Sequence, residues 1–228
     1  MCFSPEADFT AAAVVGVVGV ETLRRVRTRR ELIVGALPLL FALHQLTEGF
    51  VWLGLRGDVS SAVGNAAKSI YVIYAYALLP IIVPIGLYLI EPSGRHRRWV
   101  LPFVALGIAV GGYLFWQVTQ YPIYAQQHAS CIAYGTHTPL GTQAAVAYVI
   151  ATCAPALLSS RRYLRWFGVA NIVGVAIALS IREADFTSVW CVYAALVSFL
   201  ILEHFRRQRR VQPARRTGPG AEALARSA

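Results

Sequence analysis

Seven apolar segments, separated by short loops, constrain the fold of this chain more than any other feature. A helix that crosses the hydrocarbon core of a bilayer needs roughly 20 mostly apolar residues. The segments cover residues 7–23, 33–55, 68–90, 99–118, 139–158, 166–182 and 187–204. This pattern predicts an all-α fold in the form of a bundle of seven transmembrane helices.

The basic residues predict how these helices are threaded through the membrane. Cytoplasmic loops of membrane proteins carry an excess of Lys and Arg. If the N-terminus lies outside, the cytoplasmic segments hold 18 of the 21 basic residues, in loops 24–30, 95–98 and 161–165 and in the tail from residue 206. An even number of helices would turn one of these basic loops outward. We therefore predict a multi-pass protein of the cell membrane with its N-terminus outside and its C-terminus in the cytoplasm.

The composition argues against a water-soluble domain and against a nucleic-acid-binding role. The chain is 57% hydrophobic and 14% charged, whereas soluble domains average about 45–50% apolar and about 25% charged residues. A net charge of +10 would ordinarily suggest nucleic acid, but here the positive charge is concentrated in the loops of one side. We therefore expect the lipid bilayer, and no nucleic acid, as a partner.

One membrane domain and one tail account for the whole chain. Residues 1–205 form the predicted seven-helix domain. Residues 206–228 are rich in Arg, Pro and Gly, and we expect them to form a disordered cytoplasmic tail that is attracted to anionic lipid. The first apolar segment is not a cleaved signal peptide, because acidic residues precede it and Arg residues follow it, the reverse of the usual order.

Small residues and prolines indicate how the helices pack. Pairs of small residues spaced four apart allow two helices to approach closely. Such pairs occur at Ala12 and Gly16 and at Gly107 and Gly111. Pro80 and Pro84 lie within the third segment, where each removes a backbone N–H group, so we predict a kink there.

The second segment carries the sharpest functional signal. His44, Glu48 and Trp52 recur every four residues and therefore share one helix face, with Gln45 beside them. Ionisable residues within a span are costly and normally face the bundle interior or a water-filled cavity. Glu48 is either a structural group or a ligand, proton donor or metal-binding carboxylate in an outward-facing pocket. The candidate structural partners are Arg182, Lys68 and His44.

Three of the four cysteines, Cys2, Cys131 and Cys191, fall on the predicted outer side, where disulfides can form. Cys131 and Cys191 are the plainest pair, and inert thiols are the other structural alternative. A metal site would use all three thiols with a His or Glu, and zinc or copper would suit it. Removal of the initiator Met would expose the Cys2 amine and thiol together. No Cys-x-x-Cys or His-Glu-x-x-His spacing supports this site.

Aromatic residues gather at the same predicted depth. Tyr71 and Tyr74 in the third segment and Trp190 at the start of the seventh would either line the pocket or belong to an interfacial aromatic belt.

The sequence lacks the motifs of several other classes of membrane protein. No glycine-rich phosphate loop is present, and the single Lys, Lys68, is too early in the chain for a retinal site in the last helix.

Three short stretches carry a resemblance to a known family: residues 1–7 (MCFSPEA), Glu48-Gly49-x-x-Trp52, and residues 188–191 (SVWC). Together they resemble a family of bacterial multi-pass membrane proteins of unknown function, whose most specific element is the Met-Cys-Phe-Ser start. The resemblance covers nearly the whole chain. It implies that Met1 is the true start and that Cys2 is more than incidental, but it supplies no activity, substrate or cofactor.

These observations leave three functions open. The one we favour is a binding or sensing protein with an outward-facing polar and thiol-bearing pocket for a metal or a small ligand. The second is a membrane-embedded enzyme for a lipid-like or apolar substrate, with Glu48 as general acid or base and Glu6 or Glu183 as the second carboxylate. The third is a structural or partner-binding membrane protein.

Overall fold

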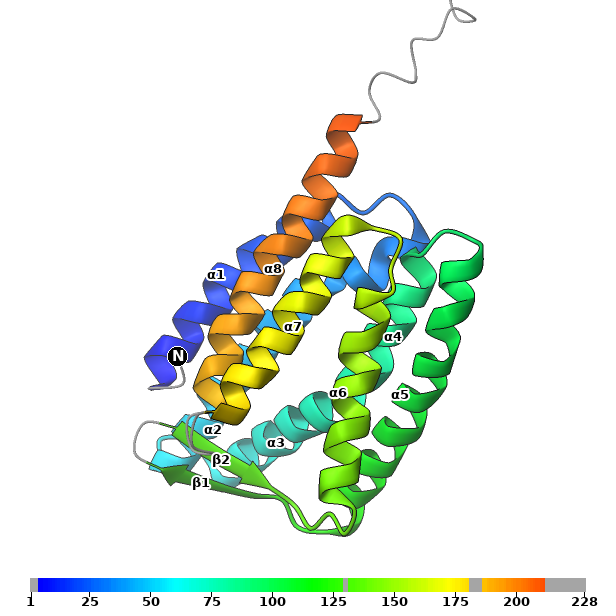
Figure 1. Cartoon of the computed structure of the whole chain (residues 1–228). Coiled ribbons are helices and arrows are strands. Elements are labelled where there is room, and N and C mark those ends of the chain that lie inside the picture. The colour runs from blue at the N-terminus through cyan, green and yellow to red at the C-terminus, as the bar shows by residue number, and fades with distance from the viewer. Residues whose placement is uncertain (1–3, 129–130, 181–185, 212–228) are drawn as a thin grey trace, which may run out of the picture.

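The computed structural model of this chain describes residues 4–128, 131–180 and 186–211. It describes the backbone alone for 128, 131, 178–180, 186–192, 194 and 208–211. The described residues form a helical bundle with one small hairpin at its end (Figure 1). Its elements are α1 (Pro5–Leu23), the 3₁₀ turn η1 (Arg29–Glu31), α2 (Leu32–Arg56), α3 (Ser61–Val72), the π-helix η2 (Ile73–Leu78), α4 (Leu79–Ile90), α5 (Arg95–Gln120), β1 (Tyr124–His128), β2 (Cys131–Gly135), α6 (Gly141–Leu157), α7 (Arg162–Ser180) and α8 (Phe186–Val211).

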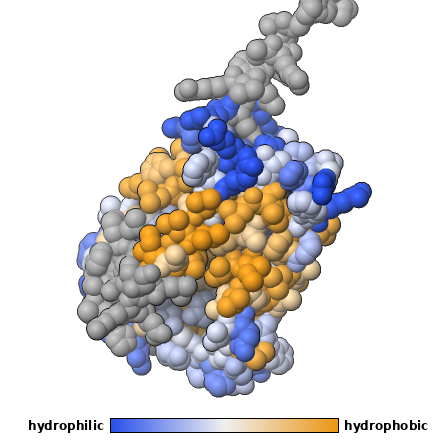
Figure 2. All heavy atoms as spheres, in the orientation of Figure 1, coloured by the Kyte–Doolittle hydropathy of each residue, from blue (hydrophilic) through white to orange (hydrophobic). Residues whose placement is uncertain are grey.

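All seven predicted apolar segments contain helix, and the third comprises α3, η2 and α4. Three helical stretches among the described residues are long and apolar enough to cross a membrane, namely Arg29–Arg56, Ser61–Ile90 and Arg95–Gln120, and Gly141–Leu157 is a shorter apolar helix. Figure 2 shows apolar side chains across the middle of one face and polar side chains toward its two ends. Helix α8 continues to Val211, so residues 206–211 of the predicted tail are helical, and the rest of the tail lies outside the described residues.

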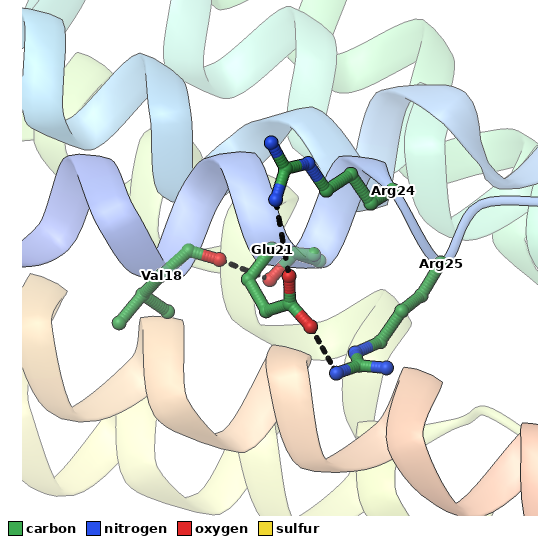
Figure 3. A network of polar contacts seen from close by, with 5 residues as sticks. Val18, Glu21, Arg24 and Arg25 are labelled. Carbon is green, nitrogen blue, oxygen red and sulfur yellow. Dashed lines mark hydrogen bonds and ion pairs between the residues drawn. The ribbon is translucent and has the colours of Figure 1, made fainter.

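The predicted basic loops lie together at one end of the bundle, which we call the basic end (Figure 1). Buried Glu91 joins two of these loops, because it accepts hydrogen bonds from Ser159 Oγ (2.7 Å) and the Ser160 backbone N–H (2.8 Å). At the end of α1, Glu21 forms ion pairs with Arg24 and Arg25 (Figure 3). The basic end therefore combines many arginines with specific contacts between its loops.

Helices α1 and α2 pack along their length through small residues. Gly16 lies opposite Ala42, and a Cβ atom at Gly19 would come within 2.6 Å of the Leu39 backbone nitrogen. Because any side chain at Gly19 would meet backbone, glycine is required there for this close approach. The predicted small-residue stripe on the first segment is thus confirmed as a packing face.

The predicted kink lies where α3 passes into α4. Pro80 lacks the N–H group that would bond to the carbonyl four residues earlier, and the helix widens into η2 just before it. The Tyr148 hydroxyl of α6 donates to the Ala75 carbonyl of η2 at 2.9 Å, while Gly111 of α5 lies against the Ala77 carbonyl. Helices α3 and α4 run in clearly different directions as a result (Figure 1).

The loop predicted between the fourth and fifth segments contains a two-stranded antiparallel hairpin that the sequence did not indicate. Its register pairs Tyr124 with Gly135 and His128 with Cys131. Ile132 is fully buried and belongs to an apolar cluster with Trp52 and Tyr71. The hairpin therefore covers the other end of the bundle, opposite the basic end. We call the end beneath the hairpin the acidic end.

Candidate functional site

Polar side chains are buried together at the acidic end, between α1, α2 and the hairpin. We define the acidic-end cluster by its members, which are Asp8, His44, Gln45, Glu48, Trp52, Tyr71, Tyr74 and Tyr134. All of them are buried except Tyr134, which is half-buried. Helices α1 and α2, the α3–η2 stretch and strand β2 each contribute, so the site exists only in the folded bundle.

The centre of the cluster is a pair of carboxylates, Asp8 on α1 and Glu48 on α2. Both side chains are 0% exposed, and they are close enough to interact electrostatically. The next residues along the two helices explain this proximity, because Gly49 lies directly against the Phe9 ring. Two carboxylates excluded from water and next to each other are costly unless a cation or a proton compensates them.

The buried Asp8 carboxylate is unsatisfied by hydrogen bonds in the described part of the chain. Neither of its carboxylate oxygens has a hydrogen-bond partner among the described residues. Trp52 is the neighbouring polar side chain, although its Nε1 also lacks a partner within that part of the chain. Since buried polar atoms are nearly always paired in folded proteins, Asp8 and Trp52 mark a place that requires explanation.

Glu48 is held by an aromatic stack. The half-buried Tyr134 hydroxyl donates to Glu48 Oε1 at 3.5 Å. The Tyr134 ring stacks on Tyr71 with 4.3 Å between centroids, and Tyr71 stacks on His44 at 3.9 Å. The stack connects the hairpin to the face of α2 that carries Glu48, and it fixes the orientation of both.

Further polar atoms of the cluster are also unpartnered among the described residues. Besides the atoms of Asp8 and Trp52, they are His44 Nδ1, Gln45 Oε1 and Tyr74 Oη. Tyr74 lies in the π-helix and packs beside the His44 ring, with 4.6 Å between centroids. The π-helix thus brings a hydroxyl to the cluster, in keeping with the frequent occurrence of such bulges at functional sites.

Glu6 and Arg56 lie at the edge of the site. The Arg56 guanidinium lies over the Trp52 ring, 5.7 Å from its centroid, and one of its nitrogens is 3.9 Å from Glu6 Oε1. Glu6 is largely exposed, and hydrogen bonds from Ser4 and the backbone, with the charge of Arg56, lower its pKa. Glu6 therefore stays ionised at neutral pH and belongs to the surface.

Most of the predicted site residues do converge. His44, Gln45, Glu48 and Trp52 share the buried face of α2 and meet Tyr71 and Tyr74. Among the described residues, Asp8 is the carboxylate buried beside Glu48, whereas Glu6 lies at the surface; Glu183 lies outside the described residues. Of the three structural partners considered for Glu48, neither Lys68 nor His44 forms an ion pair with it in the described part of the chain, and Arg182 is outside that part.

Asp8 is the functional candidate that the sequence did not single out. Its position in the sequence could have indicated its burial. Asp8 lies four residues before Ala12 and eight before Gly16, and so lies on the small-residue stripe that packs against α2. An acidic residue on such a stripe points toward the neighbouring helix.

The predicted thiol site lies mostly beyond what the structure describes. Cys2 is outside the described residues, and the side chains of Cys131, Trp190 and Cys191 are outside them too. The backbone places β2, which carries Cys131, in contact with α8, which carries Cys191. Within the described side chains, Cys153 is free and buried, and no group of three or more His, Cys, Asp or Glu residues could hold a metal ion.

A family model described as a family of unknown function matches residues 1–216. No curated protein and no solved structure matches the chain. Function must therefore be argued from the acidic-end cluster itself.

Proposed function

This chain belongs to the family of unknown function DUF6629, and we propose that it is an integral membrane protein that binds a small ligand in the acidic-end cluster. The ligand is a cation or a molecule rich in hydrogen-bond donors. The observation that carries this proposal is the fully buried Asp8 carboxylate, which lies beside Glu48 and has no hydrogen-bond partner among the described residues.

The chemistry of the cluster favours a positively charged ligand. Asp8, Glu48 and Gln45 offer acceptor oxygens, and the aromatic faces of Tyr71 and Trp52 add negative potential. Arg56, a described cation at the same end, lies near the surface carboxylate of Glu6 and over the Trp52 ring. A cationic ligand would compensate the Asp8 carboxylate, whose oxygens have no hydrogen-bond partner among the described residues.

Under this proposal the chain crosses the cell membrane seven times, with the acidic end outside. Two observations support the arrangement. The basic loops gather at one end of the bundle (Figure 1), as the positive-inside rule requires of a cytoplasmic side, and the cluster lies at the opposite end. The ligand would then be taken up from the external side.

A metal-binding form of the same function uses the thiols. The contact between β2 and α8 supports placing Cys131 and Cys191 near each other, and Cys2 would complete a site for zinc or copper. Elemental analysis of the purified protein tests this form. Bound metal that is lost in Cys2→Ser would support it, whereas metal-free wild type would overturn it.

Enzymatic chemistry is the second candidate, because Asp8 and Glu48 supply two buried carboxylates of the kind used as general acid and base. The substrate would be lipid-like or apolar and would enter from the bilayer. Extracts of membranes with and without Glu48→Gln would be compared for lipids that accumulate or disappear. Identical profiles would contradict an enzymatic role.

Thermal unfolding of the full chain in detergent micelles tests the binding function. The probes are sodium, magnesium, zinc and tetramethylammonium chlorides, each compared at constant ionic strength. A probe at 100 times its dissociation constant stabilises the folded state by about 2.7 kcal/mol. We expect at least one probe to raise the unfolding temperature of wild type but not of Asp8→Asn.

Glu6→Gln is the matched control for this experiment, because it removes a carboxylate from the same end but from the surface. It should respond to the probe as wild type does. If no probe stabilises wild type, or if Asp8→Asn responds like Glu6→Gln, the proposed binding function is contradicted.

A further inference from the structure

We infer that the basic end binds the phosphate group of an anionic phospholipid through arginines on two adjoining loops. We call these arginines the arginine surface, and they are Arg95, Arg97, Arg98, Arg162 and Arg165. The inference goes beyond ligand binding at the acidic end and does not depend on it. The two proposals share one premise, which is that the chain lies in a membrane.

Two loops are held against each other at this place. One joins α4 to α5, and the other joins α6 to α7. Buried Glu91 of the first loop accepts hydrogen bonds from Ser159 Oγ at 2.7 Å and from the Ser160 N–H group at 2.8 Å. Near the start of α5, His96 Nδ1 lies 3.1 Å from the Leu158 carbonyl oxygen. These contacts bring the first turn of α5 next to the loop that leads into α7.

The arginine surface carries positive charge that the described protein does not neutralise. None of its five arginines forms an ion pair with a described residue. Glu91 is the acidic residue of these loops, but its side chain is buried and its oxygens accept from Ser159 and Ser160. Glu91 therefore joins the two loops and leaves the arginines available to an external anion.

Other arginines of the basic end have acidic partners within the chain. Glu21 forms ion pairs with Arg24 and Arg25 at the end of α1 (Figure 3), and Glu203 forms one with Arg207 on α8. The positive-inside rule requires only that basic residues lie on one side of the membrane, and paired arginines satisfy it equally well. The arginines without such partners are thus a particular feature of the two joined loops.

Arg97 is already positioned for an anion. Its guanidinium lies over the Tyr88 ring, 4.3 Å from the centroid. Its Nε atom is buried and has no hydrogen-bond partner among the described residues. Arginine presents a rigid fork of donors that matches a phosphate group, and it stacks on aromatic faces. An arginine held by a ring in this way loses little freedom when it binds phosphate.

Two tryptophans place the arginine surface at the level of lipid head groups. Trp99 lies one turn into α5 and Trp166 one turn into α7, and they are 45% and 55% exposed. The Arg95 guanidinium lies over the Trp99 ring, 4.7 Å from its centroid. Exposed tryptophans gather at membrane interfaces, and apolar side chains cover the middle of the face in Figure 2. An anion that reaches arginines at this depth is part of a membrane phospholipid.

Native mass spectrometry of the full chain, released from uncharged detergent micelles, tests the inference. The probes are phosphatidylglycerol, which is anionic, and phosphatidylcholine with the same acyl chains, which is zwitterionic. Inorganic phosphate is the third probe, because it supplies the anion without the lipid. We expect wild type to bind phosphatidylglycerol at least about tenfold more tightly than phosphatidylcholine, since each basic residue near anionic lipid contributes roughly fivefold. An equal concentration of inorganic phosphate should not displace it.

A triple variant with Arg98→Gln, Arg162→Gln and Arg165→Gln tests the arginine surface itself. All three side chains are exposed, so their replacement leaves the packing of the bundle unchanged. The affinity for phosphatidylglycerol should fall at least about tenfold, and the affinity for phosphatidylcholine should stay the same.

The matched control carries Arg24→Gln, Arg25→Gln and Arg207→Gln. It removes the same charge from the same end, but from arginines that have acidic partners. Its affinity for phosphatidylglycerol should fall by less than about threefold, because the paired arginines contribute less attraction. Equal losses in the two triple variants would overturn the inference, since the attraction would then belong to the whole basic end.

The wild-type result does not depend on the folding of variants. Equal affinities of wild type for phosphatidylglycerol and phosphatidylcholine would overturn the inference. Displacement of phosphatidylglycerol by inorganic phosphate would also overturn it, because the surface would then bind soluble anions. Asp8→Asn should bind phosphatidylglycerol as wild type does, so a failure of the acidic-end proposal is seen separately from a failure of this one.

Discussion

The hydroxyl of Tyr134, on a surface hairpin, lies 3.5 Å from Oε1 of Glu48, which is fully buried in α2. This contact joins the strand pair to the bundle through a charged group. The same Tyr134 ring continues into the stack with Tyr71 and His44. The hairpin therefore both covers the acidic-end cluster and orients its central carboxylate.

Removal of this hydroxyl in Tyr134→Phe should weaken the hold on Glu48 while keeping the ring stack. Because the contact is long, we expect a loss of about 1 kcal/mol in the free energy of unfolding, below the range of about 1.5–3 kcal/mol for a hydrogen bond to a charged group. Denaturant titration in micelles measures it. Tyr124→Phe, which changes an exposed tyrosine of the same hairpin, should be nearly neutral. Equal losses in both variants would mean that the Glu48 contact is unimportant.

The close approach of α1 and α2 predicts that Gly19→Ala is strongly destabilising. The added methyl group would meet the Leu39 backbone, which cannot move aside as a side chain would, so we expect a loss of about 1–3 kcal/mol. Gly112→Ala is the matched control, since a Cβ there meets nothing within 4 Å and Ala favours helix. If the two variants were equally stable, the described packing of α1 on α2 would be wrong.

Substitution of the buried Glu91 carboxylate at the basic end should also reduce stability. Glu91→Gln removes the charge from the hydrogen bonds with Ser159 Oγ and the Ser160 N–H, and hydrogen bonds to charged groups contribute about 1.5–3 kcal/mol each. We expect a loss of stability of at least about 1 kcal/mol, measured by unfolding in micelles. Glu203→Gln removes a surface carboxylate paired with Arg207 and should cost about 0.5 kcal/mol or less. The reverse order would contradict this assignment.

The Tyr148 hydroxyl should stabilise the π-helix η2. In Tyr148→Phe the half-buried Ala75 carbonyl loses the hydroxyl that donates to it at 2.9 Å, and the loss of such a hydrogen bond costs about 1 kcal/mol. We expect reduced stability and faster amide hydrogen exchange in η2 and the adjoining part of α4. Unchanged exchange in this segment would show that η2 does not depend on the hydroxyl.

The helices could be predicted from sequence because each apolar segment has the length that a membrane or bundle core requires, and because His44, Glu48 and Trp52 repeat at the helical period. The hairpin could not, since its strands depend on Ile132 packing against Trp52 and Tyr71, a contact between distant parts of the chain. Asp8 was missed for a similar reason. An acid in the first turn normally favours the exposed helix N-terminus, and only the packing of α1 on α2 buries it.

A double-mutant cycle on Asp8→Asn and Glu48→Gln tests most directly whether the two carboxylates act as one site. The free energies of unfolding of wild type, both single variants and the double variant are measured in the same micelles. Two carboxylates that bind one ligand together predict a coupling energy of about 1–3 kcal/mol between the two changes. Effects that add to within about 0.5 kcal/mol would show that Asp8 and Glu48 are independent, and would contradict the account.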